Sequence, residues 1–166
     1  MANKGNLLRD AVVEYINSWG APVEVLKEVN IGYRFVNTPR RLDIAIHNKL
    51  NDKCMAIECK LQLTKGTAYE KFSYALEDCI NSPIPTILVF AGDSIKDDMK
   101  SKLVMSGRGI EVEFQEEDRK IVDKKNLLKQ RCYIELGLNW FPFATGQRMK
   151  KQLEDLKEND IFEAEE

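Results

Sequence analysis

Apolar and polar residues alternate most regularly between positions 41 and 62, and this alternation predicts a β-hairpin. Apolar side chains recur at every second position from Leu42 to Ile46, and again from Met55 to Leu61, on either side of the polar segment KLND. Successive side chains of a strand point to opposite faces of its sheet, so each set belongs to one face. We expect the apolar face to join the core. The other face carries Asp43, Glu58, Lys60 and Gln62, with small alanines beside them.

The length of the polar segment predicts the register of this hairpin. If Asn48 pairs with Lys53, the four residues between them form a loop of a common hairpin length. The same register sets Asp43 directly opposite Glu58, with Cβ atoms about 4.5–5.5 Å apart. Two carboxylates that face each other repel unless positive charge lies between them. Lys60 can supply that charge from two residues away, and so can a divalent cation with oxygen ligands, most simply Mg²⁺.

The periodicity of the remaining sequence up to Phe114 predicts helices and strands around the hairpin. Helices are indicated by apolar stripes at helical spacing, capping residues and terminal glycines, and strands by alternating or continuous apolar runs. The expected elements are a helix at 4–19 ended by Gly20, one or two strands at 22–36, a helix begun by a capping box at Thr67–Glu70 and ended by Asn81–Pro83, a strand at 86–91, a helix capped by Ser94 and ended by Gly107, and a strand at 110–114.

The order of these elements predicts a mixed α/β sheet with helices on both faces. It reads helix, three strands, helix, strand, helix, strand, in which the first three strands form a meander and the later two arrive through helical crossovers. The continuous apolar run TILVFA at 86–91 is typical of a strand that is covered on both faces, usually a parallel one.

The sequence beyond Glu116 is less informative. A basic stretch includes a helix from Asp123, the segment 132–140 reads as either helix or strand, and 145–158 reads as a helix with Met149, Leu153 and Leu156 on one side. We expect this region to serve DNA contact, dimerisation or both, although covering the core is the commoner use of aromatic residues such as Trp140. The basic residues are Arg119, Lys120, Lys124, Lys125, Lys129 and Arg131.

Composition and charge narrow the class of protein. The chain has 166 residues, 43% of them hydrophobic and 31% charged, which is ordinary for a soluble globular protein of one domain. It shows neither a signal peptide nor an apolar run of membrane-spanning length, so we expect a cytoplasmic protein without a membrane partner. From Leu153 to Glu166 the net charge is −6, so the remainder carries +4 of the total of −2. A weakly basic body is compatible with nucleic acid.

Cysteine and histidine do not indicate a metal site. The four cysteines lack C-x-x-C spacing and histidine-rich partners, so zinc is not expected and reduced thiols are the better interpretation. The single histidine, His47, lies toward the hairpin turn and is interpreted as a surface residue. The cysteines are Cys54, Cys59, Cys79 and Cys132.

The spacing of Asp43 and the tripeptide Glu58-Cys59-Lys60, on two strands of a hairpin, resembles the motif of the PD-(D/E)XK nuclease superfamily. The resemblance includes the αβββαβ order of elements, with E-x-K on the third strand, and covers about residues 4–114. The segment 66–71 also resembles one that follows the E-x-K strand in some restriction-type members. The "PD" half departs from the motif, because Pro39 stands four residues before Asp43.

The resemblance implies a restriction-endonuclease-like core and a metal-dependent DNA endonuclease of restriction type. Asp43, Glu58 and the carbonyl of Cys59 would hold Mg²⁺, with Mn²⁺ as a substitute, and Lys60 would assist the attacking water. Many members carry an acidic residue on the first helix that completes the metal site, and its position favours Glu14 over Asp10. The other residues expected at the site are Gln62, which points the same way, and Arg40, Arg41 and Lys65, which can contact phosphates.

Three alternatives stay open. The first is a Holliday-junction-resolving endonuclease of the same fold, and the second is a non-catalytic DNA-binding module. The third is an exposed hairpin in which Lys60 merely relieves carboxylate repulsion. Either endonuclease would be a homodimer, because one site of this type cuts one strand. We expect one nuclease domain over 1–166, with its core at about 4–114, a C-terminal extension at about 115–158 and an acidic tail at 159–166.

Overall fold

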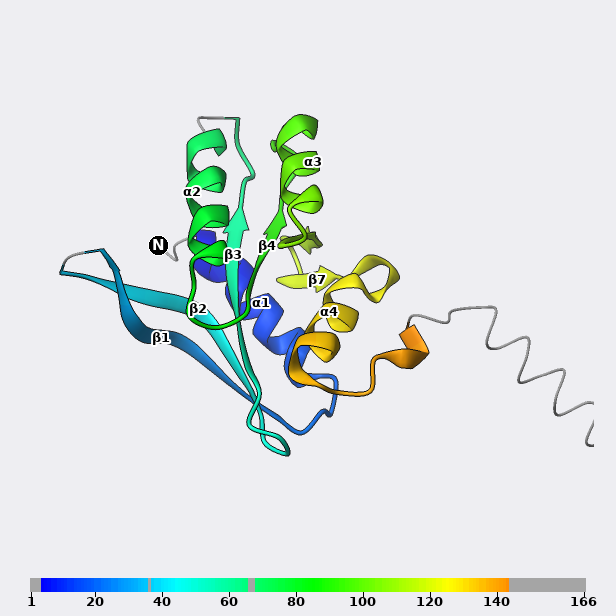
Figure 1. Ribbon diagram of the computed structural model, residues 1–166. Coiled ribbons are helices and arrows are strands. Elements are labelled where there is room, and N and C mark those ends of the chain that lie inside the picture. The colour runs from blue at the N-terminus through cyan, green and yellow to red at the C-terminus, as the bar shows by residue number, and fades with distance from the viewer. Residues whose placement is uncertain (1–3, 36, 66–67, 144–166) are drawn as a thin grey trace, which may run out of the picture.

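A five-stranded sheet with helices on both faces forms the centre of the protein (Figure 1). The computed structural model describes residues 4–35, 37–65 and 68–143. In chain order the elements are α1 (Lys4–Asn17), β1 (Val23–Phe35), β2 (Thr38–Asn48), β3 (Cys54–Leu61), α2 (Ala68–Ile80), β4 (Thr86–Ala91), α3 (Asp97–Met105), β5 (Gly109–Glu111), β6 (Glu113–Gln115), β7 (Lys120–Val122), the 3₁₀ helix η1 (Lys124–Asn126) and α4 (Leu127–Leu136).

The strand order and directions confirm the predicted mixed sheet. The sheet runs β1-β2-β3-β4-β5, and the first three strands are an antiparallel meander. β4 and β5 are added in parallel after the crossover helices α2 and α3. The order α1, β1, β2, β3, α2, β4 is the predicted αβββαβ core, with residues 58–60 on its third strand.

One face of the sheet is covered by α1 and α4. Leu8, Val12 and Ile16 of α1 are completely buried against the apolar side chains of the hairpin and of β4. Leu128 and Leu136 of α4 complete this cluster. The apolar face of the predicted hairpin therefore does join the core.

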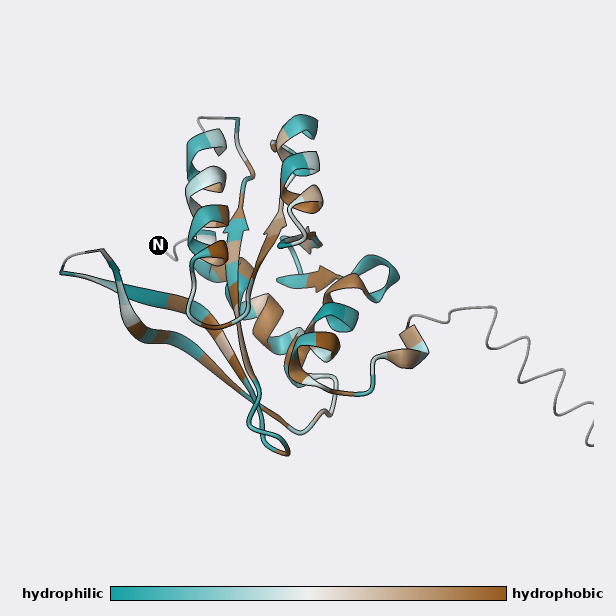
Figure 2. Ribbon diagram, viewed as in Figure 1, coloured by the Kyte–Doolittle hydropathy of each residue, from teal (hydrophilic) through white to brown (hydrophobic). Residues whose placement is uncertain are grey.

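The opposite face of the sheet is covered by α2 and α3. Phe72 of α2 and Leu103 of α3 pack with Leu88 and Phe90, which point to this side of β4. The Phe72 and Phe90 rings meet edge to face with centroids 6.3 Å apart. All six residues of β4 are buried, and its hydrophobic colour in Figure 2 continues onto the inner sides of the helices. The polar face of the hairpin is thus partly enclosed, and Glu58 on it is buried, so the prediction of an exposed hairpin was wrong.

Two local predictions before and after α3 were wrong. Ser94 does not cap this helix; its hydroxyl donates instead to the carbonyl of Leu63 at 3.2 Å. The run 110–114 is not one strand, because it changes partner at the buried Val112. Ile110 belongs to β5 and pairs with β4, whereas Phe114 belongs to β6 and pairs with β7. The alternation persists through the break because both residues pack on the same core cluster.

The helix predicted from Asp123 is present as η1 and α4. The Asp123 carboxylate accepts the N–H groups of Leu128 and Lys129 at 2.9 and 3.0 Å, which satisfies donors of the first turn. The helix ends at Gly137, which adopts a left-handed φ of +68°. The segment 132–140 is therefore helical as far as Leu136. The predicted helix at 145–158, the acidic tail at 159–166 and the capping residue Thr67 lie outside the described residues.

Among the helices of the described ranges, none combines the length and the apolar character that a membrane crossing requires.

Gly92 follows the end of β4 and lies directly against Gln62, which follows the end of β3. This close approach provides a test of the packing between the two strand ends. A Cβ at Gly92 would lie 1.9 Å from the Gln62 carbonyl oxygen, and its φ is +122°. We expect Gly92→Ala to lower the free energy of unfolding by about 2–4 kcal/mol through overlap and backbone strain. Urea denaturation measures this loss.

Gly32→Ala is the matched control, because Gly32 also has a positive φ, of +59°, but a Cβ there meets nothing within 4 Å. It should cost only about 1–2 kcal/mol, the strain of a left-handed residue. Equal losses for the two variants would contradict the close approach of Gly92 to β3.

Candidate active site

The predicted register of the hairpin is confirmed. Ile44 pairs with Ile57 and His47 with Cys54, and the Asn48 N–H donates to the Lys53 carbonyl at 2.8 Å. Continued by one residue, this register sets Asp43 opposite Glu58, where the recorded backbone pairing of the two strands ends.

β2 and β3 separate at this point, and a side chain replaces the next backbone acceptor of the ladder. In a continued antiparallel ladder the Cys59 N–H would donate to the carbonyl of Leu42. It donates instead to Oδ2 of Asp43 at 2.8 Å. The backbone of β3 therefore holds the Asp43 carboxylate in place beside Glu58.

Glu58 is a buried carboxyl with 7% of its surface exposed. It pairs with Leu88 of β4 and so lies on the face covered by α2 and α3. Burial, followed by the negative charge of Asp43 and a hydrogen bond with it, raises the pKa of Glu58 to about 8. Without a cation, Glu58 is therefore largely protonated at neutral pH.

Lys60 lies on the same face, two residues along β3. It is half-buried and pairs with Phe90 of β4. Its positive charge opposes the rise in the pKa of Glu58, so the ammonium group acts on the carboxyl pair electrostatically. The structure thus brings together Asp43, Glu58 and Lys60, as the sequence predicted. Gln62 is turned away, because its side-chain amide donates to the carbonyl of Thr64 in its own loop.

The carboxyl pair has the donor chemistry of a magnesium site. Mg²⁺ is usually held by one or two carboxylates and keeps several waters. Within the described ranges, no three His, Cys, Asp or Glu side chains gather as a metal cluster. A cation here would therefore rely on Asp43, Glu58, the Cys59 carbonyl and water. The Cys59 thiol is excluded, because it is buried in the core cluster and burial raises its pKa well above the usual value.

Neither carboxylate of the first helix is brought to this pair. Glu14 is exposed and borders a small cavity with Lys120 and Ile121 of β7. Asp10 is paired with Arg9 at 3.0 Å and with Lys27 at 3.3 Å. The reason is the rotation of α1 about its axis, which turns Leu8, Val12 and Ile16 to the sheet and Glu14 toward β7. Glu14 is therefore not a residue of this site.

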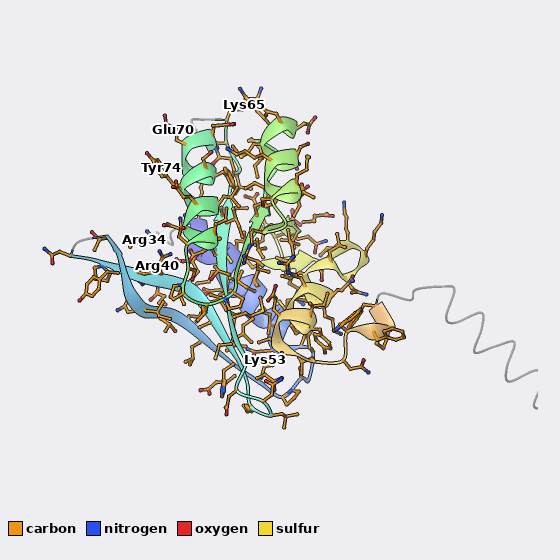
Figure 3. All side chains as sticks on the ribbon, viewed as in Figure 1. Arg34, Arg40, Lys53, Lys65, Glu70 and Tyr74 are labelled. Atoms are coloured by element: carbon orange, nitrogen blue, oxygen red, sulfur yellow. The ribbon has the colours of Figure 1, made fainter. Side chains whose placement is uncertain are left out.

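The basic residues expected at phosphates have different environments. Arg40 is buried, with 6% exposed, and donates to the Asp78 carbonyl of α2 at 3.0 Å, so its role here is structural. Arg41 has a side chain 58% exposed. Lys65 is exposed in the loop before α2, away from Arg40 (Figure 3). His47 is at the hairpin turn, where its Nε2 contacts Asp52 at 2.9 Å, as expected of a surface histidine.

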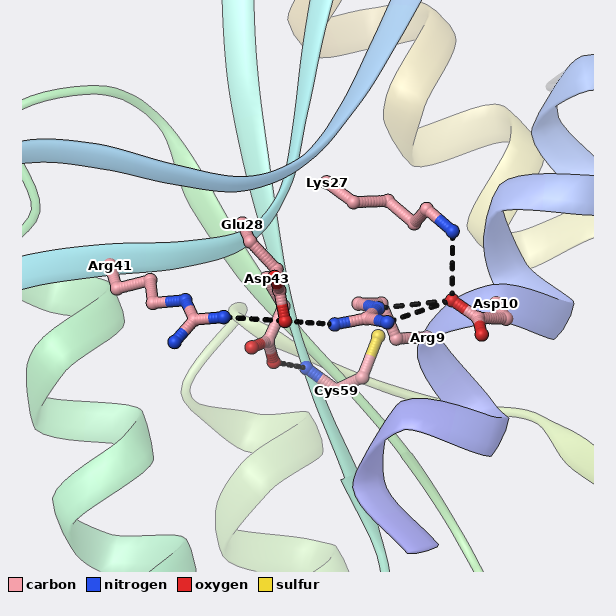
Figure 4. A network of polar contacts seen from close by, with 7 residues as sticks. All are labelled: Arg9, Asp10, Lys27, Glu28, Arg41, Asp43 and Cys59. Carbon is pink, nitrogen blue, oxygen red and sulfur yellow. Dashed lines mark hydrogen bonds and ion pairs between the residues drawn. The ribbon is translucent and has the colours of Figure 1, made fainter. Parts of the chain in front are cut away.

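Arg9 and Glu28 border the site (Figure 4), although no pattern in the sequence indicated them. Oε1 of Glu28 accepts from Arg9 at 2.7 Å and is paired with Arg41 at 2.5 Å. Arg41, followed by Arg9, lowers the pKa of Glu28, which therefore stays ionised. Glu28 has a left-handed φ of +58°, which is uncommon outside glycine. Neither the alternation of β1 nor the charge pattern of α1 predicts this arrangement.

One cavity in the described part of the chain lies away from this site. It has a volume of about 1000 Å³ and is bordered by β5, the end of α3 and α4. Its described lining residues do not include Asp43, Glu58 or Lys60. The candidate site is therefore located by the separation of β2 from β3.

The chain is similar to one family of known proteins. A family model described as a PD-(D/E)XK nuclease superfamily domain matches residues 2–131. No curated protein matches the chain. Among solved structures, the chain is similar to a crystal structure of AF1548, a protein of unknown function, with 14% sequence identity, 79% of each chain covered and a TM-score of 0.45.

The raised pKa of Glu58 predicts how stability and cation binding depend on pH. Between about pH 4.5 and about pH 8, the folded protein keeps a proton on Glu58 that the unfolded chain has lost. The free energy of unfolding should therefore fall as pH rises through this window. A divalent cation competes with that proton, so millimolar Mg²⁺ should raise the melting temperature more above pH 8 than below pH 6.

Two variants test this assignment by thermal melting with and without Mg²⁺. Glu58→Gln should lose both the response to Mg²⁺ and the pH dependence of that response. Glu14→Gln, which removes a carboxylate beside β7, should keep both. A Mg²⁺ response that survives Glu58→Gln but not Glu14→Gln would place the cation elsewhere.

Proposed function

Because the chain belongs to the PD-(D/E)XK nuclease superfamily, we propose that it is a metal-dependent endodeoxyribonuclease that hydrolyses phosphodiester bonds with Asp43, Glu58 and Lys60. The observation that carries this proposal is the convergence of these three side chains where β2 leaves β3. Members of this superfamily generally use divalent metal ions and act on nucleic acids. The finer assignment to DNA, to internal cleavage and to Mg²⁺ is our proposal.

The two carboxylates and the Cys59 carbonyl are the groups that would hold Mg²⁺, with Mn²⁺ as a substitute. The bound ion would neutralise charge on the phosphate and lower the pKa of a coordinated water. The buried position of Glu58 supports this role, because an ionised carboxylate beside Asp43 is unfavourable until positive charge reaches it. The hydrogen bond from the Cys59 N–H holds the Asp43 carboxylate beside Glu58, where both could bind one cation.

Lys60 would act on the water and on the phosphate. Its ammonium group has three donors and lies on the face that carries both carboxylates. It can hold the attacking water by a hydrogen bond and stabilise the negative charge that develops on the phosphate oxygens. Its half-buried position limits its movement and its contact with bulk water, which strengthens such an interaction.

We propose restriction-type cleavage of duplex DNA, which the resemblance to restriction-type members supports. Such an enzyme would work as a homodimer, because paired cuts need two sites. A junction-resolving endonuclease and a non-catalytic DNA-binding module of the same fold are the alternatives. The same experiment distinguishes all three.

That experiment is a cleavage panel of plasmid, linear duplex, four-way junction, single-stranded DNA and RNA, each with Mg²⁺, with Mn²⁺ and with chelator. We expect cation-dependent cleavage of duplex DNA by the wild type. Asp43→Asn and Glu58→Gln should abolish it while the proteins stay folded, as circular dichroism can verify. Selective cleavage of the junction would favour the resolving enzyme. Binding without any cleavage would favour the binding module.

Lys60→Ala separates catalysis from cation binding. Because the cation is held by the carboxylates, we expect the Mg²⁺-induced rise in melting temperature to persist or increase in this variant. The initial cleavage rate should fall by about 10²–10³, the typical effect of removing one transition-state contact. The pair of measurements is the thermal shift and the initial rate in Mg²⁺.

Lys53→Ala is the control, because Lys53 is exposed on the same hairpin but at its turn (Figure 3). It should leave both measurements unchanged. Loss of the cation response in Lys60→Ala with an unchanged cleavage rate would contradict the role given to Lys60.

A further inference from the structure

Two arginines that are distant in the sequence converge on one oxygen atom. Arg9 of α1 and Arg41 of β2 contact Oε1 of Glu28, at 2.7 and 2.5 Å (Figure 4). Guanidinium groups present planar sets of N–H donors that match carboxylate and phosphate oxygens alike. The structure therefore contains a site for an anionic oxygen, and an internal carboxylate fills it.

This site borders the carboxyl pair. Lys27 pairs with Ile44 and Val29 with Leu42, so the register places Glu28 level with Asp43 on the neighbouring strand. Arg41 is two residues before Asp43 on β2, which puts both on the same side of the strand. Arg9 comes from α1, on the other face of the sheet, and reaches this level through its contact with Glu28. The arginine pair therefore lies next to the strand of Asp43, where a nucleic acid bound at the carboxyl pair would bring a neighbouring phosphate.

The Glu28 side chain can move away without leaving a buried arginine unpaired. Its side chain is 41% exposed, whereas that of Arg9 is only 10% exposed. Arg9 also pairs with Asp10 at 3.0 Å, so it would keep a counterion after Glu28 moved. The left-handed backbone of Glu28 is strained for a residue with a side chain, and a change of conformation would relieve that strain.

We propose that Arg9 and Arg41 form a binding site for a nucleic-acid phosphate, and that the Glu28 carboxylate occupies this site until the phosphate displaces it. The inference rests on the proposed function, because it concerns the substrate of the same site. Displacement makes Glu28 a competitor of the substrate, so the measured affinity is lower than that of the freed arginine pair.

The opposite arrangement makes the opposite prediction. If Glu28 served to aim Arg41 at the phosphate, its removal would weaken binding. If Glu28 occupies the phosphate site, its removal strengthens binding. The sign of the change in affinity therefore decides between the two roles.

The experiment is fluorescence anisotropy with labelled duplex and single-stranded DNA in the presence of chelator, so that binding is measured without cleavage. We expect Glu28→Gln to bind about two- to tenfold more tightly than the wild type. Glu24→Gln is the matched control, because it removes the same charge from an exposed position of the same strand. Its affinity should change less than that of Glu28→Gln.

Arg41→Gln tests the other half of the site. It should weaken binding and reduce the slope of log affinity against log salt by about 0.7–0.9, the loss of one phosphate contact. Arg9→Gln should act in the same direction. Should Arg9→Gln fail to fold, the double variant Glu28→Gln/Arg41→Gln supplies the test, because the gain from Glu28→Gln should shrink in that background.

The outcomes separate this inference from the proposed function. Binding by Glu28→Gln that is weaker than the wild type, or no tighter than by Glu24→Gln, overturns the displacement and leaves the nuclease assignment standing. A wild type that binds neither form of DNA in chelator, and cleaves no substrate of the panel with Mg²⁺ or Mn²⁺, overturns both.

Discussion

The hydrogen bond from the Cys59 N–H to Asp43 is the interaction on which the site depends. At this position β2 stays paired with β1, while β3 stays paired with β4. The backbone N–H and C=O groups with which β2 and β3 would face each other therefore lose their hydrogen-bond partners. A backbone donor left unpaired beside the core is costly. The Asp43 carboxylate removes that cost and is itself held in place. The price of the arrangement is a second carboxyl, Glu58, buried next to the first.

The part of the site that the sequence predicted is the part governed by local geometry. A strand has a side-chain period of two, and a four-residue loop fixes which residues of a hairpin face each other. These two constraints are sufficient to place Asp43, Glu58 and Lys60 together. The buried strand β4 was predictable for a similar reason, because its short, continuous apolar run is typical of a strand covered on both faces.

The parts that the sequence did not predict depend on packing between distant segments. The stripe of α1 shows which side chains are buried, but the rotation of the helix about its axis decides whether Glu14 faces the carboxyl pair or β7. The left-handed backbone at Glu28 could not be predicted, because the residue is not glycine, the usual sequence signal of a positive φ. The split at Val112 leaves the alternation intact, so the pattern could not reveal that Ile110 and Phe114 belong to different sheets.

The charges around the site explain how such an arrangement is tolerated before a ligand binds. The proton on Glu58 and the nearby ammonium of Lys60 limit repulsion within the carboxyl pair. Beside it, Asp10 and Glu28 offset two of the three positive charges of Arg9, Arg41 and Lys27. Binding of a divalent cation together with a phosphate would exchange these internal partners for external ones, the cation replacing the proton and the phosphate replacing Glu28. The first exchange would relieve the repulsion within the carboxyl pair, and the second would relieve the backbone strain at Glu28. Both binding events would therefore act on the same few residues.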